Sequence, residues 1–206
     1  MNLPNKLTLS RILMVPIFML IIIPIPDWMF ESSTLSFIHP QLSAVNDYIL
    51  NYGNYLAAFL FLIAASTDGL DGYIARKRKQ ITRFGKFLDP IADKLLVTAA
   101  LIALVERNDL TSWAATVIIG REFIITGLRL VAASDGIVIA ASKWGKIKTI
   151  TQIVAIIATL LKNYPITIIW PEFPLDRYLM VIAVIATIYS AYDYIMKNSN
   201  VIDFNK

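Results

Sequence analysis

Cysteine is absent from this 206-residue sequence, and histidine occurs once, at His39. Without cysteine there are no disulfide bonds, no thiolate nucleophile and no cysteine-ligated metal site. A single histidine cannot form a histidine metal site by itself. The lack of cysteine leaves the redox compartment undetermined. Chemistry that depends on thiolates or on paired histidines is therefore excluded.

Charge is also scarce, since 17% of the residues are charged and 57% are hydrophobic. Soluble domains contain about 25% charged and about 45–50% apolar residues. The apolar excess lies in runs of about 20 residues, the length that an α-helix needs to cross a bilayer core. No long polar segment interrupts these runs. We therefore predict an all-α, polytopic integral membrane protein with one domain over residues 1–206.

Six apolar segments are predicted to be transmembrane helices. They cover residues 7–26, 55–74, 90–105, 110–133, 144–161 and 178–195. The first is N-terminal, basic and apolar like a signal peptide, but its apolar part is too long and no cleavage site follows, so we expect it to be retained. Residues 27–54 mix aromatic and polar side chains, and we expect an extracytoplasmic or interfacial loop with a short interfacial helix.

Lysine and arginine are missing from residues 27–54 but gather on the other side of the predicted spans. The connection between the second and third spans carries Arg76, Lys77, Arg78, Lys79, Arg83 and Lys86, and that between the fourth and fifth carries Lys143, Lys146 and Lys148. Cytoplasmic loops are enriched in these residues. We therefore expect a multi-pass protein of the cell membrane whose two termini face the cytoplasm. The acidic residues around the connection between the second and third spans are expected to face the same side.

Four aspartates stand between two apolar segments. Asp68 and Asp71 are three residues apart, and Asp89 and Asp93 are four apart, so each pair lies on one face of a helix. The intervening loop is expected to contain Gly85 and to let the two helices run antiparallel. The four carboxylates can then converge on one site.

Carboxylates this close repel one another in a low dielectric, and a divalent cation removes the repulsion. Their hard oxygens suit Mg²⁺ or Mn²⁺, and four of them can hold two ions, as in many enzymes that displace phosphate esters. Taken singly, each pair has another interpretation: Asp89 before Pro90 is typical of a helix N-cap, and Asp71 before Gly72 of a turn. Together with the spacing of the small residues, the four aspartates favour a site.

The segment reads Asp68-x2-Asp71-Gly72-x2-Ala75-Arg76-x8-Gly85-x3-Asp89-x3-Asp93. It resembles the complete signature of the CDP-alcohol phosphatidyltransferases, without departure from the pattern. The stretches MNLPNKLTLSRI, IIGREFIITGLR and ASKWGKIKT extend the likeness, in particular to the phosphatidylglycerophosphate synthases of that family. The resemblance implies a six-helix membrane enzyme, commonly a homodimer, that moves a phosphatidyl group from CDP-diacylglycerol to an alcohol and releases CMP.

The resemblance also implies a role for each residue of the signature. It implies that the metal ions are bound by Asp68, Asp71, Asp89 and Asp93, and that Asp93 is also the general base on the acceptor hydroxyl. It implies that CDP-diacylglycerol is bound by Asp68, Gly72, Ala75, Arg76 and Gly85. Gly72, Ala75 and Gly85 would leave room for the nucleotide, and Arg76 would pair with the pyrophosphate.

A charged acceptor should leave basic residues elsewhere in the chain. Arg121 lies inside the fourth predicted span, where an unpaired guanidinium is costly, and its alternative partner is Glu122. We expect Arg121, Lys143 and Lys146 to bind the phosphate of sn-glycerol 3-phosphate. Arg129 and Thr149 are weaker candidates, because Arg129 can instead extend to the membrane interface.

Two alternatives remain open. The same chemistry with inositol phosphate or serine as acceptor is the first, although serine would not require the basic cluster. The second is a divalent-cation transport protein, which the basic run from Arg76 to Lys86 disfavours because it suits a polyanionic ligand. No second half mirrors the aspartates, which weighs against an inverted-repeat carrier. No nucleic-acid partner is expected.

Overall fold

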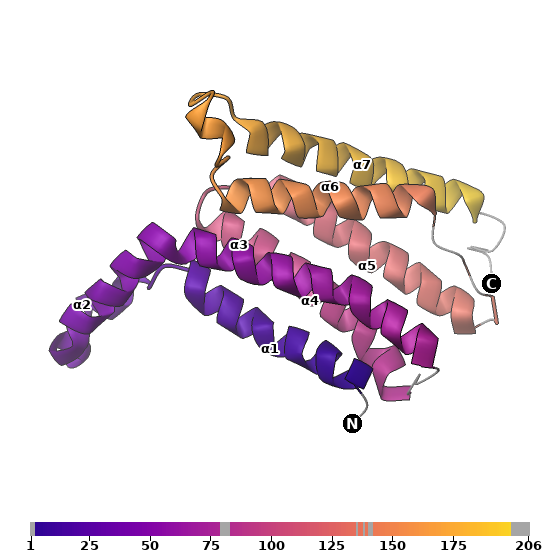
Figure 1. Cartoon of the computed structure of the whole chain (residues 1–206), viewed down its shortest axis with the longest axis horizontal. Coiled ribbons are helices and arrows are strands. Elements are labelled where there is room, and N and C mark those ends of the chain that lie inside the picture. Colours follow the sequence, from indigo (N-terminus) through magenta and orange to yellow (C-terminus); the bar gives the residue numbers. More distant parts are fainter. Residues whose placement is uncertain (1–2, 79–82, 135, 138, 140–141, 199–206) are drawn as a thin grey trace. The chain divides into compact units, whose positions relative to one another are not determined.

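The structure is a computed structural model of the chain, and it describes residues 3–78, 83–134, 136–137, 139 and 142–198. Every regular element in these ranges is a helix, as predicted from the sequence. The chain divides into two compact units, Met1–Asp109 and Leu110–Lys206, and each is described by itself. Figure 1 labels the main helices.

The first unit contains three long helices, α1 (Leu3–Ile22), α3 (His39–Arg78) and α4 (Arg83–Glu106). The helix α1 packs against both α3 and α4, as Figure 1 shows. Its buried face includes Phe18 and Ile22, and the ring of Phe18 lies 6.3 Å from that of Phe61 on α3. Burying apolar faces in this way holds the three helices together.

The far end of α1 is bound to the end of α4 by Arg107. Its Nη1 atom donates a hydrogen bond to the carbonyl oxygen of Ile22 at 2.9 Å, and its Nε atom lies 3.6 Å from Oδ2 of Asp109. The last carbonyls of a helix have no partner within the helix, and a cation there also complements the helix dipole. Arg107, the residue that follows α4, therefore caps the C-terminal end of α1.

The helices α1 and α3 approach each other closely at Gly53. A Cβ atom built on Gly53 would lie 2.4 Å from the carbonyl oxygen of Ile21, a distance that real Cβ atoms do not show. The obstacle is backbone, which cannot move aside as a flexible side chain can. Gly53 therefore sets the distance between the two helices.

We expect Gly53→Ala to lower the stability of the purified protein by about 1–3 kcal/mol, because the added methyl group forces α1 and α3 apart. Thermal unfolding in one detergent measures the effect. Gly120→Ala on α5 is the matched control, since nothing lies within 4 Å of the position of its Cβ. Alanine also favours helix over glycine, so the control should be neutral or slightly stabilising. An equal change in the two variants would contradict the close contact.

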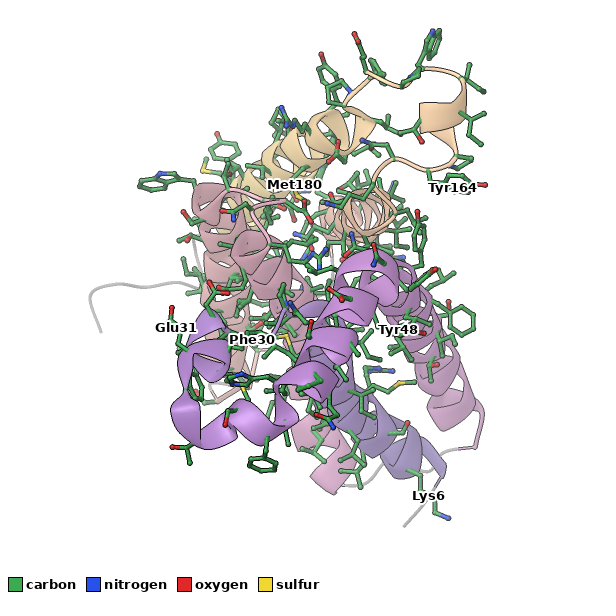
Figure 2. The ribbon with its side chains drawn as sticks, turned by 90° about the vertical axis from the view of Figure 1, so that its left-hand side faces the viewer. Lys6, Phe30, Glu31, Tyr48, Tyr164 and Met180 are labelled. Atoms are coloured by element: carbon green, nitrogen blue, oxygen red, sulfur yellow. The ribbon has the colours of Figure 1, made fainter. Side chains whose placement is uncertain are left out.

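Residues 27–54 differ from the expected loop. They form α2 (Asp27–Glu31), the 3₁₀ helix η1 (Ser33–Ile38) and the first 16 residues of the 40-residue α3. Side-chain contacts stabilise the helical form of this segment. Tyr48 and Tyr52, four residues apart on α3, are in ring contact at 5.3 Å. Asn46 Oδ1 accepts a hydrogen bond from Ile25 N at 2.9 Å, which binds α3 to the residues that follow α1. Figure 2 shows Tyr48 on the outer side of this helix. Mixed composition indicated irregular structure, whereas helical spacing of the aromatic residues was the better signal.

Each of the six predicted spans overlaps a long helix, although α1 ends at Ile22, four residues before the predicted end of the first span. The long helices of the second unit are α5 (Ser112–Ser134), α6 (Lys143–Leu160) and α7 (Leu175–Lys197). By length and composition, two described segments are long and apolar enough to cross a membrane, Ser36–Thr67 and Leu175–Lys197. A shorter apolar helix covers Thr8–Ile22. The structure thus confirms the helical architecture, and six bilayer crossings stay a prediction.

In the second unit α7 packs against both α5 and α6. A short 3₁₀ helix, η2 (Ile166–Ile168), lies in the connection between α6 and α7. Figure 2 shows Tyr164 in this connection. The buried face of α7 carries Met180, Ala183, Thr187, Ser190 and Tyr194. These residues recur every three or four positions, so small and polar side chains form the face that meets the other two helices.

Candidate active site

The four aspartates lie on two helices of the first unit. Asp68 and Asp71 belong to the last part of α3, and Asp89 and Asp93 belong to α4. The two helices are in contact, and Figure 1 shows them running in opposite directions from ends that lie close together. The side chains of the four aspartates are outside the described part of the structure. Their backbone gives the helical spacing that the sequence predicted.

The backbone also excludes the two simpler interpretations of the aspartates. The helix α4 begins at Arg83, well before Asp89, so Asp89 is not a helix N-cap. The helix α3 continues through Asp71 and Gly72 to Arg78, so no turn separates them. Neither pair is therefore explained by ending or beginning a helix.

Gly85 was expected in the loop between the helices, and this was wrong. It lies in the first turn of α4. The reason is that most residues from Arg83 to Asp89 are compatible with a helix, which continues once it has formed a first turn. The remaining connection, residues 79–82, is outside the described residues, and Lys79 of the predicted basic loop is among them.

The first helix adds two buried polar side chains near this end of the unit. Thr8 and Arg11 are buried on α1, and each has an interaction partner. They are three residues apart and therefore lie on one face. Arg11 was not among the site residues predicted from the sequence. A basic residue within an apolar run, one turn from a hydroxyl, was the signal that could have revealed it.

A second polar cluster lies within the second unit. Arg121 on α5 donates from Nη2 to Ser190 Oγ on α7 at 2.7 Å, and its Nη1 lies 3.5 Å from Glu122 Oε1. Lys148 on α6 donates from Nζ to the same oxygen of Glu122. The side chains of Arg121, Glu122 and Lys148 are only 10%, 14% and 6% exposed. Two cations thus share one carboxylate, and the trio keeps one net positive charge.

Three further contacts extend this cluster along α7. Gln152 Nε2 on α6 donates to Thr187 Oγ1 at 2.9 Å, and Thr187 in turn donates to Ala183 O at 2.6 Å. The guanidinium carbon of Arg129 lies over the ring of Tyr194, 5.3 Å from its centroid. A cation in this position is attracted to the electron-rich face of the ring. All three helices of the unit therefore contribute polar side chains to its interior.

Comparison with known proteins shows the family to which the chain belongs. The model of the family CDP-alcohol phosphatidyltransferase matches residues 1–189. The chain belongs to this family. The expectation drawn from the signature is thereby confirmed, and the chain is an enzyme of the phosphatidyltransferase class.

Curated relatives of this phosphatidyltransferase match over most of its length. A protein of Bacillus subtilis (strain 168) is 46% identical over 197 residues, which cover 96% of this chain and 95% of the relative. One of Rickettsia typhi is 34% identical and covers 94% of both chains. One of Haemophilus influenzae is 39% identical over 75% of this chain and 73% of its own. Each is named CDP-diacylglycerol–glycerol-3-phosphate 3-phosphatidyltransferase.

The residues predicted to bind the acceptor are placed differently within this phosphatidyltransferase. Arg121 lies in the buried cluster, in contact with Glu122 as the alternative interpretation expected. Lys143 and Lys146 are exposed on α6 and do not contribute to it. The buried lysine of α6 is Lys148, which was expected only as one of the basic residues between the fourth and fifth predicted spans.

The two hydroxyl groups near the start of α6, one of them that of the candidate Thr149, also have local partners. The Thr149 hydroxyl donates to Gly145 O at 3.0 Å, and Ser142 caps α6 by accepting from Gly145 N at 3.1 Å. The face of α6 that packs inward therefore carries Lys148 and Gln152 and not Lys146 and Thr149. Ser190 was also missed from the sequence, because a serine within an apolar span gives no signal of its own.

The aspartates fit a divalent metal ion by the chemistry of the donor set. Two helices in contact each carry a pair of carboxylates at helical spacing, and hard oxygen donors suit Mg²⁺ and Mn²⁺. Among the side chains that the structure describes, no group of three acidic, histidine or cysteine residues offers another such site. The aspartate segment is therefore the part of the chain to consider for metal binding.

Proposed function

We propose that the protein transfers the phosphatidyl group of CDP-diacylglycerol to sn-glycerol 3-phosphate, giving phosphatidylglycerophosphate and CMP in anionic phospholipid biosynthesis. The observation that carries the proposal is the relative named for this reaction, which is 46% identical over 96% of the chain. The basic cluster around Arg121 supports an acceptor that bears a phosphate, because guanidinium and phosphate match in charge and geometry.

On the donor side, Asp68, Asp71, Asp89 and Asp93 would hold two ions of Mg²⁺ or Mn²⁺. Bound metal ions would supply positive charge that offsets the charge on the phosphate oxygens. Arg76 would pair with the pyrophosphate, and Gly72, Ala75 and Gly85 would give the nucleotide access to the helix backbone. The helical placement of both aspartate pairs supports this arrangement.

In the transfer step, Asp93 would accept the proton of the attacking hydroxyl of the acceptor. The hydroxyl oxygen forms a bond to the phosphorus that carries the diacylglycerol, and the bond from this phosphorus to the oxygen of CMP breaks. CMP leaves with the electron pair of that bond. Arg76 would stabilise the charge that develops on the leaving group.

On the acceptor side, Arg121 would bind the phosphate, with Lys143 and Lys146 at the cytoplasmic end of α6 drawing the anion towards it. Arg129 and Thr149 are secondary candidates. The position of Lys148 makes it a further candidate, since it shares Glu122 with Arg121. A phosphate that binds here has to share the two cations with that carboxylate.

In the membrane, we propose six spans, both termini and the site on the cytoplasmic side of the cell membrane, and a homodimer. The six long helices and the asymmetry of the basic loops support the six spans and the orientation. The family resemblance supports the dimer and a single membrane domain over residues 1–206, with residues 27–54 on the opposite face. The acyl chains of the donor would then remain in the bilayer while its headgroup reaches the aspartates.

The test is a comparison of acceptors with the purified protein, CDP-diacylglycerol and Mg²⁺. We expect CMP release and lipid product with glycerol 3-phosphate, and little of either with inositol 1-phosphate, serine or phosphatidylglycerol. A preference for inositol 1-phosphate or serine would keep the reaction and change the acceptor. If no acceptor released CMP and vesicles containing the protein took up Mn²⁺, the transport alternative would replace the proposal.

A further inference from the structure

Tyr194 on α7 combines deep burial with an unused hydroxyl group. The residue is 1% exposed, and its hydroxyl has no hydrogen-bond partner within the part of the chain that the structure describes. Buried tyrosines usually find a partner for this group, because an unpaired buried donor is costly. A phenylalanine would fill the same space without that cost. The hydroxyl therefore needs an explanation other than packing.

The surroundings of Tyr194 favour an anion. Ser190, one turn earlier on the same face of α7, accepts the hydrogen bond from Arg121 Nη2. Arg121 and Arg129 are eight residues apart on α5, so they lie about two turns apart on the same side of this helix. The Nε–H of Arg121 is a second buried donor without a partner among the described residues. Two unused donors and two cations thus occur together on one side of α5 and α7.

Arg129 also brings a positive charge close to Tyr194. Its guanidinium lies over the ring at 5.3 Å from the centroid. The contact is an electrostatic attraction between the cation and the ring face, and it holds a positive charge beside Tyr194. Hydrogen bonds to a charged oxygen are stronger than those between neutral groups. The arrangement is thus suited to an acceptor atom with negative charge.

We propose that Tyr194 is a further acceptor-binding residue, whose hydroxyl donates a hydrogen bond to a phosphate oxygen of the acceptor. The proposal rests on the proposed function, because it assumes an acceptor that carries a phosphate monoester. Ser190 serves it as a positioning residue, since it fixes the guanidinium of Arg121 beside the same face of α7. The last helix then takes part in acceptor recognition together with α5.

The test is Tyr194→Phe, which removes one oxygen atom and leaves the ring under Arg129. We expect the KM for glycerol 3-phosphate to rise by about ten- to hundredfold, the loss of one hydrogen bond to a charged group, with the KM for CDP-diacylglycerol within about twofold. The inhibition constant of inorganic phosphate, tested as a competitive inhibitor of glycerol 3-phosphate, should rise by the same factor. The melting temperature should stay equal or rise, because an unpaired buried hydroxyl is removed.

Tyr192→Phe is the matched control, since Tyr192 lies on the same helix and is 60% exposed. It should leave both KM values unchanged. An unchanged KM for glycerol 3-phosphate in Tyr194→Phe would overturn the assignment, as would equal increases in both KM values. If the wild-type protein itself gives no product with glycerol 3-phosphate, the proposed function fails first. If the wild type is active and Tyr194→Phe matches it, only the assignment of Tyr194 fails.

Discussion

Asp93→Asn is expected to reduce kcat by about 10²–10⁴-fold, the contribution of a positioned general base. Asparagine has nearly the same shape as aspartate but cannot accept the proton of the attacking hydroxyl. Asp93 lies inside α4, far from both ends of this helix, so the change should not disturb the helix. The measurement is steady-state CMP release at saturating concentrations of both substrates.

A matched control and a metal titration separate the possible roles of Asp93. Asp47→Asn changes an exposed aspartate of α3 outside the signature and should leave kcat unchanged. If a large excess of Mg²⁺ restored the activity of Asp93→Asn, Asp93 would be a metal ligand and not the base. Intact turnover at ordinary Mg²⁺ would remove the general-base role altogether.

Arg121→Ala should raise the KM for glycerol 3-phosphate by about a hundredfold and leave that for CDP-diacylglycerol within about twofold. The figure corresponds to the loss of a charge-assisted contact with phosphate worth about 3 kcal/mol. Arg121 is the residue of α5 that both lies in the buried cluster and retains an unused donor, its Nε–H, among the described contacts. Its removal should therefore affect the acceptor specifically.

Two further variants test this interpretation of Arg121. Arg177→Ala changes an exposed arginine at the start of α7 and should alter neither KM. Arg121→Lys keeps the charge but loses the planar guanidinium that contacts phosphate with two nitrogens. Its KM for glycerol 3-phosphate should therefore be intermediate between those of the wild type and Arg121→Ala. Equal increases in the KM values of both substrates in Arg121→Ala would show a general disturbance and contradict an acceptor role.

The helices were predictable from the sequence because apolar runs of suitable length leave few other structures in a bilayer. Their boundaries were less so. The helix α3 starts at His39, long before its apolar run, since contacts such as Tyr48 with Tyr52 and Asn46 with Ile25 N support a helix that composition alone did not indicate. Gly85 was wrongly expected in a loop, because a single glycine does not prevent a helix from starting.

The two parts of the candidate site, the aspartates and the cluster around Arg121, differed in how much of their geometry could be predicted from the sequence. The aspartates follow helical spacing within one segment, so the faces that they share could be predicted from that spacing alone. The basic cluster depends on which faces of α5, α6 and α7 meet. In helices that are apolar on all sides the sequence does not specify this. Lys148 and Ser190 emerged only from the packing.

The hydrogen bonds of α7 have a consequence for how this helix keeps its orientation. Lipid tails are as apolar as the helix surface, so hydrophobic burial does little to decide which side of a helix faces its neighbours. Ser190 accepts a hydrogen bond from α5 and Thr187 accepts one from α6, and these residues are less than one turn apart. Rotation of α7 about its axis would break both bonds at once. The two hydroxyls therefore fix the angular setting of the last helix, and with it the direction in which every other side chain of that helix points.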